Sequence, residues 1–181
     1  MLLIPKNASD EWKNAYAKIT IRNVASIIEV SYGKYSVLNG MVVLNDKNVS
    51  DDCLYIVNGI VILETVEKIP DLCVNGLLLK RKKSRYEMTR MNGRSVEVED
   101  NVVIKPYPNT IEIDGDTVRS FDYNTLVAAG NNVDIVDDVT EQMLSDKKIT
   151  FAAGNEVKCG KSILGYVLSL IHISEPTRPE P

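Results

Sequence analysis

Ser36–Leu44 reads SVLNGMVVL, and the same order of residue types returns in YIVNGIVIL (Tyr55–Leu63) and LCVNGLLLK (Leu72–Lys80). Each stretch places Asn-Gly between two short apolar runs. Asn and Gly tolerate positive φ, which a sharp change of chain direction requires, and Val, Ile and Leu favour extended chain. Each unit is therefore predicted to be a strand, a turn and a second strand.

The repeat continues along the chain when glycine is taken as its origin. In every unit the residue two positions before the glycine and the residue three positions after it are apolar. Such regularity is typical of repeat architectures, in which each unit buries its apolar face against its neighbours. The origins are spaced 15 to 24 residues apart, about 19 on average, and are Gly40, Gly59, Gly76, Gly93, Gly115, Gly130 and Gly154.

We expect a mainly β fold, a β-solenoid of about seven irregular strand-turn-strand coils. About 19 residues at about 3.3 Å each give a perimeter of three short faces. The alternative is an antiparallel meander of β-hairpins, because Asn-Gly between apolar runs is also a strong hairpin signal. A solenoid would stack equivalent asparagines, whose amides could form a ladder of hydrogen bonds. The predicted turn and ladder residues are Asn39, Gly40, Asn58, Gly59, Asn75, Gly76, Asn92 and Gly93.

Two segments predict helices beside the strands. Ser9 would cap a helix in SDEWKNAYAKI, whose apolar face, led by Trp12, would turn inward and cover the open end of the stack. Asp138, with Glu141 three residues later, would begin a short helix near 138–145. That unit would read strand, turn, strand and short helix.

These elements divide the chain into an N-terminal helix and cap (1–33), a repeat domain truncated at its C-terminus (34–167) and a tail (168–181) that we interpret as non-native. Leu168–Arg178 reads LSLIHISEPTR and resembles translated read-through of a sequencing adapter. Such residues are excluded from fold reasoning. The exclusion removes His172, the only histidine of the chain, so we expect no histidine chemistry.

Composition narrows the classes of partner and compartment. The net charge is −4 and 44% of the residues are hydrophobic, which suits an ordinary folded core and makes a nucleic-acid partner unlikely on charge grounds. No signal peptide and no apolar run long enough for a transmembrane segment is found, so a cytoplasmic location is expected. The three cysteines are far apart and form no Cys-x-x-Cys pair, which argues against a disulfide framework or a zinc site.

The short Val- and Ile-rich strands punctuated by glycine, over about Ser36 to Val157, resemble bacterial β-solenoid proteins, including the polymer-forming bactofilins. The resemblance is one of general style and rests on no specific motif. It implies a cytoskeleton-like scaffold. It assigns no site residues, and the helix expected near residue 140 departs from that family.

Three stretches resemble functional motifs, but a structural interpretation fits each of them better. Gly154–Ser162 (GNEVKCGKS) ends like a phosphate-binding loop, but Asn155 occupies the position where the motif requires its first glycine. Asp114 and Asp116 are too few for a calcium loop, which needs several alternating oxygen ligands. The basic run Lys80–Arg85 suits a solvated loop. We therefore expect no catalytic, cofactor-binding or metal-binding residues, and no cofactor.

One apolar pattern suggests an interaction surface. If the residue three positions after glycine points inward, the residues two and four positions after it point outward. In the first three units these are almost all apolar, and in the later units they are polar. Such a stripe marks either a partner surface or a face that the N-terminal helix covers. The candidate contact residues are Val42, Leu44, Val61, Leu63 and Leu78.

The sequence thus predicts a structural or interaction scaffold without enzymatic activity, which binds itself or another protein through this stripe. The alternative is a carbohydrate-active or other solenoid enzyme. Its catalytic carboxylate pair would be brought together by the fold, or would lie in a part of the protein beyond Val167.

Overall fold

The computed structural model describes residues 2–5, 8–18, 27–30 and 34–170. These residues form a mainly β fold, a parallel β-solenoid of about five turns with coils of about 19 residues and a few short helices. Every strand pairing within the described ranges is parallel. Hairpins pair antiparallel, so the hairpin meander is wrong.

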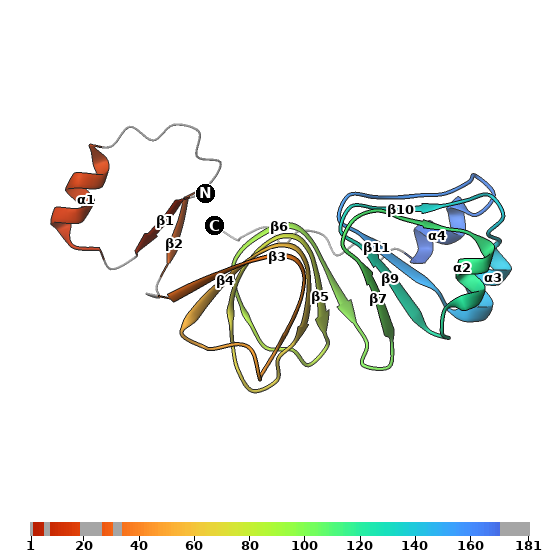
Figure 1. Cartoon of the computed structure of the whole chain (residues 1–181), viewed down its shortest axis with the longest axis horizontal. Helices are drawn as coiled ribbons and strands as arrows, with labels where there is room; N and C mark the ends of the chain where they lie inside the picture. The colour runs from red at the N-terminus through yellow and green to blue at the C-terminus, as the bar shows by residue number, and fades with distance from the viewer. Residues whose placement is uncertain (1, 6–7, 19–26, 31–33, 171–181) are drawn as a thin grey trace.

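The first lobe (residues 34–98) is built from four long strands. These are β3 (Lys34–Asn45), β4 (Cys53–Glu64), β5 (Asp71–Arg81) and β6 (Glu87–Val98), paired in that order. Each strand runs through its Asn-Gly pair without interruption and curves around the lobe (Figure 1). The glycines stand in register, Gly40 beside Gly59, Gly59 beside Gly76 and Gly76 beside Gly93.

The second lobe (residues 103–170) has shorter strands in two three-stranded sheets, with helices interleaved (Figure 1). One sheet has the order β11-β9-β7 and the other β12-β10-β8. The elements are β7 (Val103–Tyr107), β8 (Ile111–Ile113), α2 (Gly115–Ser120), β9 (Thr125–Ala129), β10 (Asn132–Ile135), α3 (Glu141–Lys147), β11 (Thr150–Ala153), β12 (Glu156–Lys158) and α4 (Leu164–Leu170).

The number of turns is about five rather than the seven expected. A stack of four strands completes three turns and a stack of three completes two, so counting units overestimates the turns. The corner expected at Gly115 is also wrong in position, because Gly115 is the first residue of α2. The corner of that unit lies between β7 and β8, near Pro108.

Three large apolar clusters hold the lobes together. Leu63, Val74 and their neighbours fill the interior of the first lobe, and Val133, Phe151 and their neighbours fill the interior of the second. The third cluster lies between the lobes, where Ile60 and Leu77 from the outer face of the first sheet meet Ala128 and other residues of the second lobe. The two lobes therefore share buried surface.

At the N-terminal end, β1 (Leu2–Pro5) pairs with β2 (Ile27–Val30), and α1 spans Asp10–Ala17. Ser9 accepts a hydrogen bond from the backbone N–H of Trp12 at 3.2 Å, which is the cap that the sequence predicted. Trp12 is 40% exposed, however, and α1 lies beyond β1 and β2 rather than over the end of the first lobe (Figure 1).

The later helix begins slightly downstream of its predicted start. Thr140, not Asp138, is the N-cap of α3, and its side chain accepts the N–H of Met143. Asp138 instead accepts the backbone N–H of Gly115. Leu144 of this helix is fully buried. No helix among the described residues is long and apolar enough to cross a membrane.

Candidate functional site

The glycine corners of the first lobe are fixed by close stacking. All four have positive φ, from 85° at Gly40 to 141° at Gly93. A Cβ atom on Gly76 would lie 2.2 Å from the carbonyl oxygen of Gly59, and Gly59 and Gly93 are crowded in the same way by the preceding corner. No side chain can therefore occupy these three positions, and the backbone of each corner remains uncovered.

Asparagine amides run along these corners as a ladder. The Nδ2 of Asn58 donates to the Oδ1 of Asn39 at 2.9 Å, and the Nδ2 of Asn75 donates to the Oδ1 of Asn58 at 2.8 Å. Asn92 stands in register with Asn75, but its amide makes no hydrogen bond within the described residues. The ladder therefore joins three of the four predicted asparagines.

The second lobe has corresponding corners with glycine before asparagine. The N–H of Asn155 donates to the carbonyl of Asn131 at 2.9 Å, so these two residues stack. A Cβ atom on Gly130 or Gly154 would lie about 2 Å from a carbonyl oxygen of the preceding corner. Sequence reasoning did not single out these two asparagines, although the repeated Ala-Ala-Gly-Asn at 128–131 and 152–155 was an available signal.

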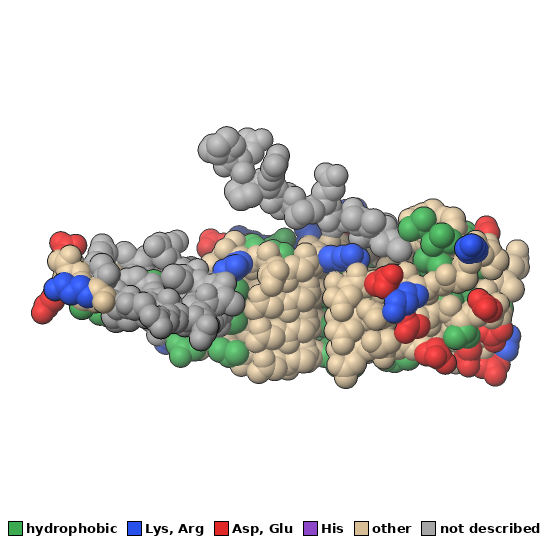
Figure 2. Space-filling model, turned by 90° about the horizontal axis from the view of Figure 1, so that it is seen from above, with side chains coloured by type: hydrophobic (Ala, Val, Ile, Leu, Met, Phe, Trp, Pro, Cys, Tyr) green, Lys and Arg blue, Asp and Glu red, His purple; other side chains and the backbone are tan. Residues whose placement is uncertain are grey.

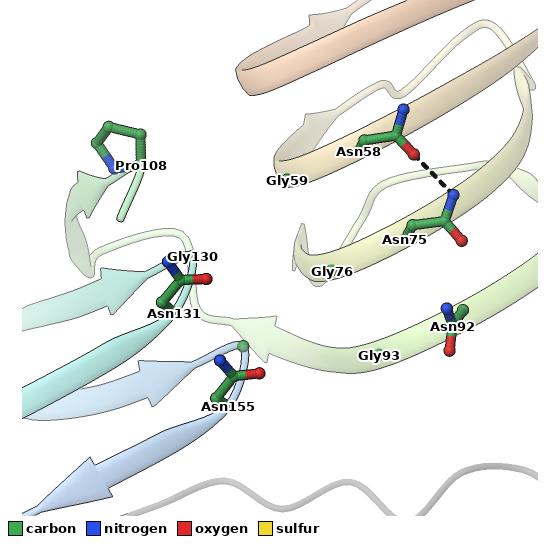
Figure 3. Close-up of a pocket in the computed structure, with 11 residues that line it drawn as sticks. Asn58, Gly59, Asn75, Gly76, Asn92, Gly93, Pro108, Gly130, Asn131 and Asn155 are labelled. Atoms are coloured by element: carbon green, nitrogen blue, oxygen red, sulfur yellow. Dashed lines mark hydrogen bonds between the residues drawn. The ribbon is translucent and has the colours of Figure 1, made fainter. Parts of the chain in front are cut away.

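The corners of the two lobes flank an open groove with a volume of about 440 Å³. The corners form the tan area at the middle of Figure 2. In Figure 3 the amide oxygens of Asn131 and Asn155 point toward the first lobe, whose ladder runs along the opposite side. The lining residues are Asn58, Gly59, Asn75, Gly76, Asn92, Gly93, Pro108, Gly130, Asn131, Gly154 and Asn155. The described part of the lining therefore consists of amides, Pro108 and backbone, without an ionisable group.

The predicted apolar stripe lies in the interior of the first lobe, not on its surface. Val61, Leu63 and Leu78 are completely buried, Leu44 is 2% exposed and Val42 is half-buried. The prediction that these side chains point outward is wrong. Because each strand passes through its glycine unbroken, the period-two alternation continues across it, and residues two before and two after glycine share the inner face.

The outer face of the first lobe is consequently formed by the residues one and three positions after glycine. On β4 and β5 these residues are buried against the second lobe, as for Ile60 and Leu77. On β3 they are exposed, 46% for Met41 and 40% for Val43, and Tyr35 and Val37 extend the same exposed row toward the strand start. An apolar face thus continues past the region that the second lobe covers.

Most of the basic run of the first lobe is paired with acidic residues of neighbouring coils. Lys80, Lys82 and Lys83 pair with Glu97, Glu99 and Asp100, at 3.2, 3.1 and 3.8 Å. Arg81 also lies near Glu64, 3.7 Å away. These pairs follow the strand register, in which Lys80 stands beside Glu97. The run therefore links neighbouring coils and offers little free charge for a polyanion.

The other candidate stretches have structural roles. Asp114 is the N-cap of α2, and the pKa of its carboxyl is lowered chiefly by hydrogen bonding to Thr117. Asp116 pairs with Arg119 on the same helix. Gly154, the first residue of the phosphate-loop-like stretch, is a stacked solenoid corner. Among the described residues, no group of three or more His, Cys, Asp or Glu side chains could hold a metal ion.

Cys73 and Cys159 offer little nucleophilic character. Burial raises the pKa of the Cys73 thiol and of the Cys159 thiol. The thiolate is the reactive form, so a raised pKa keeps these side chains protonated at neutral pH. His172 lies outside the described residues, and the interpretation of the tail stays a prediction.

Comparison with protein families, curated proteins and solved structures gives no match for this chain. The site is therefore defined by its geometry alone. Two features stand out in that geometry. One is the uncovered apolar row on β3, and the other is the amide-lined groove between the lobes.

Proposed function

We propose that this chain is a non-enzymatic scaffold that associates with a second copy of itself through the outer face of β3. The observation that carries the proposal is the row of exposed apolar side chains at Tyr35, Val37, Met41 and Val43. The second lobe covers the positions of β4 and β5 that correspond to Met41 and Val43. Leu54 and Ile56, which correspond to Tyr35 and Val37 on β4, are buried in a separate cluster. Covering the row on β3 would extend an apolar contact that the molecule already makes.

A second copy suits this surface because the row is self-complementary. Two copies related by a two-fold axis would place the same apolar row of each against that of the other, which is the usual geometry of homodimers. The outward positions from Tyr35 to Val43 carry no charge, and beside Tyr35 their only polar residue is Asn39. No like-charge repulsion would therefore oppose the contact.

The position of β3 in its sheet supports the same partner. In the sheets formed by the described residues β3 is an edge strand that pairs only with β4. An edge strand presents unpaired N–H and C=O groups that favour pairing with another chain. The edge and the exposed face together distinguish β3 from the other strands of the first lobe.

The non-enzymatic part of the proposal rests on how the acidic residues are used. The carboxylates that drew attention in the sequence cap helices or pair with nearby cations, as Asp114 and Asp116 do. Such groups are engaged in stabilising the fold. A hydrolytic activity that survived purification and depended on one of these carboxylates would contradict this part of the proposal.

The experiment is a comparison of self-association by analytical ultracentrifugation over a range of protein concentrations. The variant Val37→Ser with Val43→Ser removes apolar surface from the row and is expected to weaken association at least about tenfold, because each exposed Val contributes apolar area to the contact. The matched control is Val66→Ser with Val103→Ser, two other exposed valines outside the row.

Wild-type protein and the control double variant are expected to associate equally. A monomeric wild-type protein at every concentration would overturn self-association through this face. Equal weakening by both double variants would show that the row on β3 has no special role. Circular dichroism of each variant checks that its fold is retained.

A further inference from the structure

The groove between the lobes has a shape that the fold cannot fill with its own side chains. Gly59, Gly76 and Gly93 on one side, and Gly130 and Gly154 on the other, are all crowded by the backbone of the preceding corner. Any residue larger than glycine would clash with a carbonyl group there. The groove is therefore held open by the same contacts that stack the coils.

The amides along the groove retain unused hydrogen-bonding capacity. An Asn side chain offers two N–H donors and two acceptor positions. Asn58, in the middle of the ladder, uses one donor and one acceptor in its bonds to Asn39 and Asn75. The side-chain amides of Asn131 and Asn155 make no hydrogen bond with other described residues, and their oxygens point toward the first lobe (Figure 3).

The chemistry of the lining selects a neutral ligand with both donors and acceptors. None of the described residues that line the groove carries a charge, so neither an anion nor a cation would find a counter-charge among them. Amides that donate and accept match hydroxyl groups, which also do both. A chain of sugar units presents such hydroxyls repeatedly along its length.

The spacing of the amides argues against an extended peptide as the ligand. Stacked coils repeat at about 4.8 Å, the separation of neighbouring strands. Equivalent groups on one side of an extended peptide repeat every two residues, at about 6.6 Å, so a peptide would lose register after one or two contacts. In a straight β-1,4-linked glycan successive rings alternate in orientation, so equivalent hydroxyl groups on one side recur every two rings and fall close to every second coil.

We propose that this groove binds a straight, neutral oligosaccharide chain, which lies along the solenoid between the amide ladder of the first lobe and the amides of Asn131 and Asn155. The site is independent of the self-association face on β3. The described lining residues include no aromatic ring, so binding rests on hydrogen bonds. It is expected to be weak and driven by enthalpy.

The test is isothermal titration calorimetry of the full chain with cellohexaose, a straight neutral glycan. Maltohexaose, which has the same composition but a curved chain, is the comparison ligand and is expected to bind more weakly. Because the described lining residues carry no charge, the affinity for cellohexaose should not change between low and high salt.

The variant Asn131→Ala with Asn155→Ala removes two amides that take no part in the ladder, so the fold should be retained. Its affinity for cellohexaose is expected to fall about tenfold, as the loss of two modest hydrogen bonds predicts. The matched control, Asn101→Ala, changes an exposed asparagine outside the groove and should bind like the wild type.

Three results would overturn the proposal. One is the absence of saturable cellohexaose binding at millimolar concentrations. Another is binding that the double variant leaves unchanged. The third is a preference for an acidic glycan such as polygalacturonate, with an affinity that falls as salt rises.

Discussion

At the scale of single residues, the corners show why Asn-Gly recurs. The glycine must have positive φ, and on β4, β5 and β6 it must also allow the preceding corner to approach within contact distance. Asparagine before it joins its amide to the next coil. Glycine thus permits the backbone conformation of the corner, and asparagine links neighbouring coils.

Gly76→Ala is expected to destabilise the protein strongly, by about 3 kcal/mol or more. The new methyl group would lie 2.2 Å from the carbonyl oxygen of Gly59, on a backbone with φ of 137°. Urea unfolding followed by circular dichroism measures the loss. The control is Gly165→Ala, where a methyl group meets nothing within 4 Å.

Gly165 lies in α4, where alanine is a better helix former than glycine. The control should therefore leave stability unchanged or raise it by up to about 1 kcal/mol. Similar unfolding midpoints for Gly76→Ala and the wild type would mean that the corners can separate without cost, contrary to their close stacking.

At the scale of elements, the loops that close the first lobe are fastened to one another. The loop after β3 carries Asp46, whose carboxylate accepts the backbone N–H groups of Val66, Glu67 and Lys68 in the loop after β4. Lys68 returns a bond from its Nζ to the carbonyl of Val49 at 2.7 Å. These contacts join neighbouring coils on the side where loops take the place of strands.

The loop contacts predict a dependence of stability on pH. The hydrogen bond from the Lys68 N–H, followed by those from Val66 and Glu67, lowers the pKa of Asp46. A lowered pKa in the folded state means that the contribution is fully present above the unfolded-state pKa, about 3.9, and is lost as the pH falls through the folded-state pKa.

Asp46→Asn should therefore be less stable than the wild type at about pH 6, with the difference shrinking as the pH falls below about 4. Urea midpoints over this range measure it. Asp100→Asn is the control, because Asp100 accepts no backbone N–H within the described residues and only approaches Lys83. An Asp46→Asn effect that is the same at every pH would exclude the carboxylate charge as its cause.

The elements of the first lobe could be predicted because their signals are local. Asn-Gly fixes a corner through φ and stacking, and Val or Ile on both sides fixes extended chain. Whether each side chain points into the lobe or away from it could not be predicted from the apolar positions around glycine alone, because apolar residues occupy both faces of β4 and β5. Leu63 faces the interior of the lobe and Ile60 faces the second lobe, yet both are completely buried.

At the scale of the whole molecule, the main feature without a local signal is the packing of the second lobe on the first. Ala128 and Ala152 lie in that contact, and their small size allows two sheets to approach. Alanine is the strongest helix former and is not typical of strands, so its presence at these positions does not indicate a contact between sheets. The groove exists only because of this contact. Since no local signal indicates the contact, the sequence did not predict the groove either.

The shared core between the lobes predicts that they unfold as one unit. Leu77 is completely buried there, against residues of the second lobe, and Leu77→Ala should cost about 2 to 5 kcal/mol. Hydrogen exchange of backbone amides reports the stability of each strand separately. If the lobes are cooperative, Leu77→Ala lowers the protection of β9 and β11 as much as that of β4 and β5.

Val103→Ala, at a partly exposed position on β7, is the control and should change protection little in either lobe. Loss of protection confined to β4 and β5 in Leu77→Ala would instead mean that the second lobe folds on its own. In that case the spacing between the two rows of amides could vary, and a ligand bound across the groove would have to fix it. Cooperative unfolding, by contrast, means that the groove is preformed by the same contact that stabilises both lobes.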